Sequence, residues 1–273
     1  MIDSGRVLLK LLETGWLRGP MKRALERRAW RIQAGEASGL RLSLPQNFDF
    51  IRGTTEPPMQ ECVATHLATG GVFYDIGANV GFFTLLAARR VGCDGAVYSF
   101  EPVHENAAAI RRNVGLNGLA NVSVFEVALD ELSRTGSLFI TKWDGGASLS
   151  TAAVARGVSV EQRAVEVMAL DDLVAAEGLR PPSLVKIDVE GAELGVLRGM
   201  VRTIERFRPV LVYEVDDGEK AAFSRRWKAL DDFVAALGYR VTHLEDSYAN
   251  IHWYVGHSLG MPHGPGGSEV GPA

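Results

Sequence analysis

The middle of the chain alternates short apolar runs with longer segments whose apolar positions recur at helical spacing. Five short apolar runs are predicted to be buried strands: Val72–Ile76, Ala96–Phe100, Val122–Phe125, 184–188 and 210–214. Helical spacing predicts helices between and after them, at 80–90, 104–117 and 221–237. Two last strands are predicted at Tyr239–His243 and 251–255. Apolar strands that alternate with helices predict an α/β fold with a doubly wound, mostly parallel sheet covered on both faces.

One long segment, about 129–183, interrupts this alternation. It contains strand-like runs at 137–141 and 163–168, separated in part by a Gly- and Ser-rich loop at 144–150. We therefore predict a β insert within the sheet domain. Loops of this length are commonly functional, so its loop is a candidate cover for a site.

The two ends of the chain differ from the middle. Residues 1–45 are predicted to be a helical extension of two helices separated at Gly19-Pro20, the second of which includes Leu25, Ala29 and Ile32. Residues 46–258 form the predicted sheet domain. Residues 259–273 are rich in Gly and Pro, have little apolar side chain to bury, and are expected to be flexible.

Charge is unevenly distributed between these regions. The net charge of the 273 residues is −4, but residues 1–31 contain eight basic and three acidic residues, a net of +5. We expect this basic helical face to be solvated while the apolar face docks. Contact with an anionic membrane surface or an acidic substrate is the alternative.

Composition narrows the class of protein. With 47% hydrophobic and 23% charged residues, the chain is expected to be globular. Its two cysteines, Cys62 and Cys93, form no CxxC pair, which argues against a disulfide scaffold or a thiolate zinc site and fits a reducing cytoplasm. No apolar run approaches the ~20 residues of a transmembrane helix. We predict a cytoplasmic protein without a transmembrane segment.

The first candidate chemistry is a glycine-containing loop, Asp75-Ile-Gly-Ala-Asn-Val-Gly81, between a predicted strand and a predicted helix. This is the context of a nucleotide-binding loop, because Gly77 and Gly81 allow close backbone approach. The spacing places Asn79 between the glycines and is not GxGxxG, so the loop alone is a weak signal.

Acidic residues at neighbouring strand ends strengthen the prediction of a ligand-binding site at this loop. Glu101 follows a strand 24 residues after Gly77, and Asp188 and Glu190 end another strand. The carboxyl ends of parallel strands converge on one crevice, so these acids and Asp75 are expected to rim a single pocket. Such a pocket repels a pyrophosphate and attracts a sulfonium cation. The sign of the charge therefore favours S-adenosylmethionine over NAD.

Several motifs then resemble one known family. They are 73–84, Phe100-Glu-Pro102, Asn113 and Asn117 before Asn121-Val122, and the Lys-Ile-Asp-Val-Glu-Gly-Ala-Glu run at 186–193. Over about residues 50–256 the chain resembles the FkbM-type family of S-adenosylmethionine-dependent class I methyltransferases. The resemblance implies a Rossmann-like, seven-stranded sheet with the seventh strand antiparallel. It also implies O-methylation of a small molecule, such as a sugar or secondary metabolite in natural product biosynthesis, with S-adenosylhomocysteine as product.

The resemblance also implies functional residues. The cofactor-binding set is Asp75, Gly77, Ala78, Asn79, Gly81, Phe82, Glu101, Pro102, Glu126, Ala128 and Asp188. Within it, the loop would hold the methionine side, Glu101 the ribose, and Glu126 to Ala128 would flank adenine. Asp188 and Glu190 would face the sulfonium and the acceptor.

Removal of the acceptor proton requires a base. Asp188 and Glu190 are the candidates by motif, but an ordinary Asp pKa near 3.9 makes a weak base unless burial raises it. His243 on the last strands has a more suitable ordinary pKa and completes the catalytic candidates; His252 is the alternative histidine.

Two neighbouring groups bear on this site. Lys186 is expected to pair with Glu214 across the sheet. Carboxylates at Asp188, Glu190 and Glu214 are hard oxygen ligands that suit Mg²⁺, but such groups are common without an ion, and no metal is predicted.

Two other classes remain open: a dinucleotide-binding oxidoreductase, and a nucleic-acid methyltransferase or cofactor-binding regulatory protein. Asn79 in place of a glycine and the acidic rim argue against the first, and the negative charge of the central region argues against nucleic acid. The expected partner is a small-molecule or glycan acceptor. A homodimer is compatible with the sequence.

Overall fold

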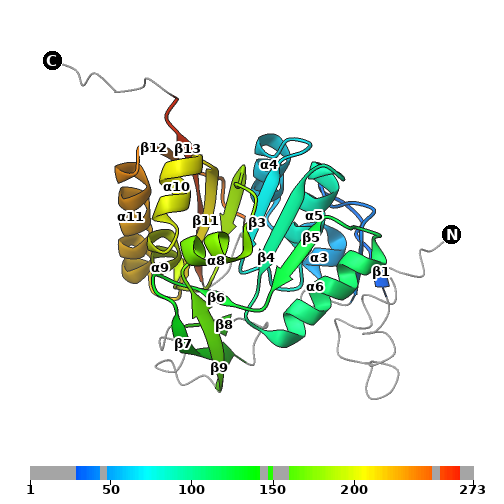
Figure 1. Cartoon of the computed structure of the whole chain (residues 1–273), viewed down its shortest axis with the longest axis horizontal. Coiled ribbons are helices and arrows are strands. Elements are labelled where there is room, and N and C mark those ends of the chain that lie inside the picture. Colours follow the sequence, from blue (N-terminus) through cyan, green and yellow to red (C-terminus); the bar gives the residue numbers. More distant parts are fainter. Residues whose placement is uncertain (1–28, 44–47, 142–146, 150–159, 248–252, 265–273) are drawn as a thin grey trace.

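The computed structural model describes residues 29–43, 48–141, 147–149, 160–247 and 253–264. Its main element is a seven-stranded sheet in the order β12-β13-β11-β10-β3-β4-β5 (Figure 1). The strands are β3 (Val72–Ile76), β4 (Ala96–Phe100), β5 (Val122–Phe125), β10 (Leu184–Ile187), β11 (Val210–Asp217), β12 (Tyr239–His243) and β13 (Tyr254–Pro262). All pairs are parallel except those of β13, which is antiparallel to β11 and β12. The predicted doubly wound, mostly parallel α/β sheet with an antiparallel seventh strand is confirmed.

Helices cover both faces of the sheet because successive strand side chains point to opposite sides. On one face, Phe73 and Val212 pack with α4 (Pro57–His66) and α5 (Phe82–Val91), beside α6 (His104–Leu116). On the other face, Tyr74 and Leu211 pack into a second core. The helices of that face are α8 (Leu170–Glu177), α9 (Glu193–Arg198), α10 (Val201–Phe207) and α11 (Lys220–Ala236). A further short helix, α3, spans Asp49–Arg52.

Five of these helices, α3, α4, α8, α9 and α10, were not among the predicted elements. Each spans 10 residues or fewer, so each shows at most three turns of its periodic pattern. A pattern this short does not distinguish a helix from a buried loop. The tertiary contacts of these segments with the sheet stabilise them.

The N-terminal prediction is wrong where the structure describes it. Ala29–Arg31 and Arg41–Ser43 are strands β1 and β2 of a small antiparallel sheet, so the second predicted helix does not continue through Ile32. Ile32 and Leu42 are buried with α5 in the core. Residues 1–28, with the rest of the two predicted helices, lie outside the described residues.

Two asparagines of the sequence motifs hold this small sheet on α6. The side-chain oxygen of Asn113 accepts hydrogen bonds from the backbone N–H and hydroxyl of Ser43, and Asn117 bonds both backbone groups of Arg41. Asn113 also donates to the carbonyl of Val80 beside the glycine loop. The β1–β2 segment is therefore part of the domain that carries the site.

The last strand lies later in the chain than predicted. β13 spans Tyr254–Pro262 instead of 251–255, so the residues from 259 to 262 belong to the sheet and not to a flexible tail. Gly256 explains the error: a Cβ there would lie 2.5 Å from the Trp227 ring of α11. A glycine that looks like a loop residue thus allows a helix to approach the strand closely. Residues 265–273 lie outside the described residues.

The insert forms a separate four-stranded sheet in the order β6-β9-β7-β8, which Figure 1 shows projecting below the main sheet. Its strands are β6 (Ala128–Leu129), β7 (Arg134–Thr141), β8 (Ala147–Ser148) and β9 (Val160–Met168). The structure thus contains the predicted β insert, and α8 completes the segment. Most of the loop at 144–150 lies outside the described residues.

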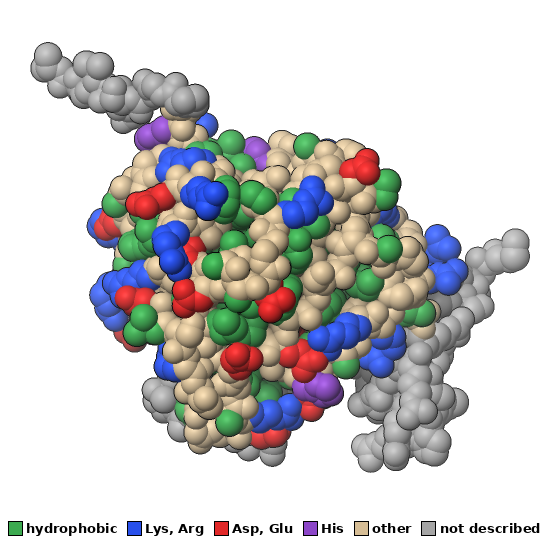
Figure 2. All heavy atoms as spheres, viewed as in Figure 1, with side chains coloured by type: hydrophobic (Ala, Val, Ile, Leu, Met, Phe, Trp, Pro, Cys, Tyr) green, Lys and Arg blue, Asp and Glu red, His purple; other side chains and the backbone are tan. Residues whose placement is uncertain are grey.

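Two features concern the surface. Within the described ranges, no helix has the length and apolar character that crossing a membrane requires. On the face drawn in Figure 2, basic and acidic side chains are interspersed and form no continuous basic area.

Candidate active site

The loop between β3 and α5 brings three chain segments into contact. The backbone N–H groups of Gly77 and Ala78 both donate to the carbonyl of Phe100 at the end of β4. Gly77 has φ +76°, and a Cβ there would lie 1.7 Å from the carbonyl oxygen of Asp188. Glycine is therefore required at this position both by backbone conformation and by space.

Glu101 is attached to the same loop. Its buried carboxylate accepts hydrogen bonds from the backbone N–H groups of Asn79 at 2.8 Å and Val103 at 2.9 Å. Burial raises the pKa of Glu101 to about 7, although these bonds and the Asn106 amide oppose the shift. The residue thus titrates near neutrality.

A cleft opens where these strand ends meet. It encloses about 640 Å³, part of which is open to solvent. Phe100, Val127 and Leu129 provide apolar walls, and the insert contributes Leu138 and Leu149. Three carboxyl groups line it, those of Glu101, Asp188 and Glu190. No Lys or Arg is among the described residues that line the cleft.

The structure brings together seven of the predicted site residues on the walls of this cleft: Gly77, Asn79, Glu101, Pro102, Ala128, Asp188 and Glu190. Four others belong to the supporting structure of the loop without lining the cleft: Asp75, Ala78, Gly81 and Phe82. Glu126 is at the surface, where it bonds His104 and Arg111.

Asp75 and Asp188 are joined through Lys186. The Lys186 ammonium donates to Oδ2 of Asp188 at 2.9 Å and lies 3.9 Å from Oδ1 of Asp75. Burial opposes the charge on Lys186, but Asp188 and Asp75 outweigh it and raise the pKa of the ammonium above its usual value. The predicted Lys186–Glu214 pair is therefore wrong, because the lysine bonds the acid two residues along its own strand.

Asp75 is fully buried and also accepts a hydrogen bond from the Thr84 hydroxyl at 2.6 Å. Burial raises its pKa above the usual range, while Lys186 and Thr84 oppose the shift. Asp75 thus orders the base of the loop from inside the domain.

Glu190 follows β10 with the left-handed φ of +54° and is exposed to the cleft. Desolvation by the surrounding protein raises the pKa of the Glu190 carboxyl group well above the usual value, and the negative charges of Asp216 and Asp188 raise it further. Its side chain is exposed at the cleft, and this repulsion acts there together with desolvation by the surrounding protein. A raised pKa makes Glu190 a better proton acceptor near neutrality than an ordinary glutamate.

The expectation for His243 as a catalytic base does not match its position. Its Nε2 bonds Asp231 at 2.7 Å, its ring stacks on Trp227, and it does not line the cleft. Asp231 and Trp227 belong to α11, so the histidine faces this helix and not the strand ends. His252 lies outside the described residues.

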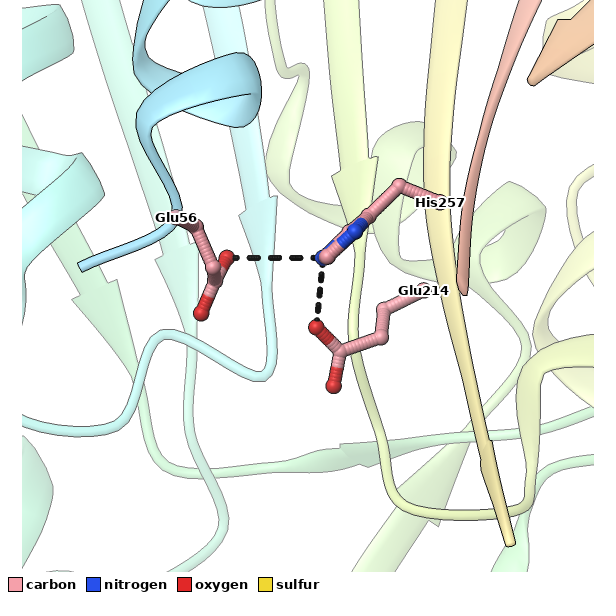
Figure 3. A group of neighbouring side chains, drawn as sticks. All are labelled: Glu56, Glu214 and His257. Atoms are coloured by element: carbon pink, nitrogen blue, oxygen red, sulfur yellow. Dashed lines mark hydrogen bonds and ion pairs between the residues drawn. The ribbon is translucent and has the colours of Figure 1, made fainter. Parts of the chain in front are cut away.

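A different histidine, which the sequence analysis did not single out, lies in a buried cluster with two glutamates. Nε2 of His257 is 2.7 Å from Oε2 of Glu214 and 3.7 Å from Oε2 of Glu56 (Figure 3). Burial lowers the pKa of the imidazole, but the hydrogen bond to Glu214 and the nearby carboxylate of Glu56 outweigh it and raise the pKa to about 10. The only signal in the sequence was a histidine in an apolar run, which is too common to be informative.

Several known proteins are similar to this chain. A family model described as the methyltransferase FkbM domain matches residues 75–241. "Methyltransferase 1" of Beauveria bassiana is 28% identical over 142 residues, which are 46% of this chain and 57% of that protein. Hexuronic acid methyltransferase AglP of Haloferax volcanii is 26% identical over 204 residues, 74% of this chain and 77% of that protein.

A solved structure is similar as well. The crystal structure of methyltransferase FkbM from Methylobacillus flagellatus KT aligns with a TM-score of 0.49 and 17% identity. The alignment covers 69% of this chain and 43% of that one. The chain thus spans about half the length of two of these three proteins.

Proposed function

The chain belongs to the FkbM methyltransferase family, and from this membership and the cleft we propose that it transfers a methyl group from S-adenosylmethionine to a hydroxyl of a small molecule, a sugar or a secondary metabolite. One observation carries the choice of donor. Carboxyl groups line the cleft, and the described lining residues include no Lys or Arg. This charge suits a sulfonium and opposes the pyrophosphate of a dinucleotide.

The residues around the loop fit such a donor. Glu101 has a carboxylate at the cleft wall that can accept hydrogen bonds from ribose hydroxyls, as acids at this strand end do in related folds. Asn79 and Gly77 line the adjoining wall, and Phe100, Val127 and Leu129 offer apolar surface for a base. When bound, S-adenosylmethionine supplies an electrophilic methyl group on a sulfonium centre.

We assign the acceptor side to Asp188 and Glu190. One oxygen of Asp188 is fixed by Lys186, which leaves the other to accept a hydrogen bond from an acceptor hydroxyl. Glu190, with its raised pKa, is the group that takes the hydroxyl proton. The insert residues Leu138 and Leu149 exclude water from that wall of the cleft.

The alternative classes have less support. Membership of a methyltransferase family gives no support to a dinucleotide oxidoreductase. A nucleic-acid acceptor would bring phosphates toward Glu101, Asp188 and Glu190 in a cleft whose described lining residues provide no basic side chain.

The proposal is tested in two steps. Isothermal titration with S-adenosylhomocysteine and with NAD is expected to give micromolar binding of the first and none of the second. Transfer of a deuterated methyl group to a panel of glycosides, uronic acids and hydroxylated metabolites is then followed by mass spectrometry. Binding of NAD alone, or methylation only of nitrogen or nucleic acid, would contradict the proposal.

A further inference from the structure

Three potential metal ligands converge beneath the acceptor side of the cleft, outside the residues to which we assign the methyl transfer. Glu214 in β11 and His257 in β13 are direct partners across the antiparallel pair, so their side chains share one face of the sheet. Glu56, which immediately precedes α4, reaches the same point from a separate segment (Figure 3). All three side chains are largely buried, with 1%, 9% and 13% exposure for His257, Glu56 and Glu214.

The spacing of their ligand atoms suits a single ion. One nitrogen of His257 and one oxygen from each glutamate all lie within 4.8 Å of one another. Ligands bound at about 2.0–2.2 Å to a tetrahedral ion are about 3.3–3.6 Å apart. The distances of 2.7 and 3.7 Å from Nε2 to the two carboxylates bracket this range. Small rotations of three side chains would therefore complete the coordination, with water in the remaining positions.

The local charge also suits a divalent ion. The carboxyl groups of Glu56 and Glu214 meet at this buried point, while the nearby Lys186 is already paired with Asp188 and lies 3.9 Å from Asp75. Buried negative charge without compensation is costly, and a divalent ion would supply that compensation.

We propose that Glu56, Glu214 and His257 bind one divalent transition-metal ion, such as Zn²⁺ or Mn²⁺. One imidazole and two carboxylates form a mixed nitrogen and oxygen donor set, which suits these ions. Ca²⁺ takes six to eight oxygen ligands and Mg²⁺ keeps most of its waters, so both fit this buried set less well. The ion would tie the start of α4 to the two strands and neutralise the carboxylates beneath Asp188.

The test uses the full chain without an affinity tag, because a polyhistidine tag binds the same ions. After treatment with a chelator and dialysis, Zn²⁺ and Mn²⁺ are titrated calorimetrically, and bound metal is counted by mass spectrometry. We expect about one ion per chain and a higher melting temperature with the ion. Co²⁺ serves as an optical probe, since the intensity of its visible absorption reports whether the bound ion is four-coordinate.

The variants His257→Gln and Glu56→Gln remove one ligand each. Each should lower the affinity for the ion by more than about 100-fold, because loss of a residue that only hydrogen-bonds a ligand already lowers metal affinity 10–100-fold. His243→Gln is the matched control, since that histidine pairs with Asp231 outside the cluster and should leave metal binding unchanged. Wild-type protein that binds no ion at millimolar concentration, or His257→Gln protein that keeps it, would overturn the proposal. A thermal melt of each metal-free variant shows that it is folded, and S-adenosylhomocysteine binding, measured in parallel, tests the proposed methyl transfer separately.

Discussion

Lys186 and Asp188, two residues apart at the end of β10, form an ion pair in which Nζ and Oδ2 are 2.9 Å apart. The lysine side chain is only 2% exposed and that of Asp188 is 23% exposed, so the pair connects the buried interior to the cleft. The aspartate is held in place and one of its oxygens is occupied. We therefore expect Asp188 to orient an acceptor more effectively than a mobile surface acid.

This pair predicts different outcomes for two substitutions. Asp188→Asn keeps an oxygen for Lys186, whereas Asp188→Ala leaves a buried ammonium without its hydrogen bond. Both variants lose the negative charge, but only the Ala variant leaves the buried ammonium without this hydrogen bond, so it should be less stable than the Asn variant by about 1–3 kcal/mol. Chemical denaturation of the two proteins measures the difference. Equal stability would mean that Lys186 finds compensation elsewhere.

Asp188→Asn also separates chemistry from binding. If Asp188 orients the acceptor hydroxyl, kcat at saturating donor should fall by about 10²-fold, the size of effect that a misplaced reacting group has. S-adenosylhomocysteine affinity should change by less than about tenfold. Near-normal turnover by the folded variant would remove Asp188 from the acceptor site.

Glu101 should make donor binding depend on pH. Ribose hydroxyls donate hydrogen bonds to the ionised carboxylate, whose pKa burial raises to about 7. S-adenosylhomocysteine affinity is therefore expected to rise about tenfold from pH 6 to pH 8, because the ionised fraction rises by that factor. Glu101→Gln should bind more weakly and without this pH dependence. A wild-type affinity that is flat over this range would contradict the assignment.

The same shift predicts the direction of a stability change. A carboxyl group whose pKa is raised by folding stabilises the folded state below its ordinary pKa of about 4.5, and this contribution is lost as the pH rises through about 7. The loss is of the order of 3 kcal/mol. Denaturation of the free protein at pH 5 and pH 8 should therefore show a larger decrease for wild type than for Glu101→Gln.

Gly77→Ala should disrupt the loop between β3 and α5. The new Cβ would meet the carbonyl oxygen of Asp188 at 1.7 Å, in addition to the strain of a positive φ. Gly118→Ala is the matched control, with φ +63° and no atom within 4 Å, and should cost about 1 kcal/mol from backbone strain alone. We expect Gly77→Ala to lose clearly more stability and to lose S-adenosylhomocysteine binding. Similar stabilities for the two variants would show that the strands can separate at low cost.

The small sheet of β1 and β2 should contribute to the stability of the whole domain. Leu42 is fully buried in the core beside α5, so Leu42→Ala should cost about 2–5 kcal/mol. Leu132→Ala, at a side chain that is 67% exposed, should change stability by less than about 0.5 kcal/mol. Thermal and urea denaturation compare the two. A neutral Leu42→Ala would mean that this segment is only loosely attached.

The sequence by itself determined the five parallel strands and the edge of the sheet at which the cleft lies. Mostly apolar runs such as Val72–Ile76 indicate strands because a strand covered on both faces is rich in apolar residues. Once the strands are parallel, their carboxyl ends meet at one edge whatever the detailed packing, so Glu101, Asp188 and Glu190 could be grouped without coordinates. The Gly77 requirement follows from the same local pattern.

Tertiary structure alone decided which side chains meet across the sheet. His243 and His257 have the same ordinary chemistry, but pairing with β11 puts His257 opposite Glu214, while α11 captures His243 through Asp231. The register of β13 depends on the close packing of Trp227 over Gly256, which no local pattern reveals. Glu56 is more than 150 residues from both of its partners in the chain, so only the folded domain brings the three together. Local periodicity specifies elements, but contacts between distant side chains depend on register and packing.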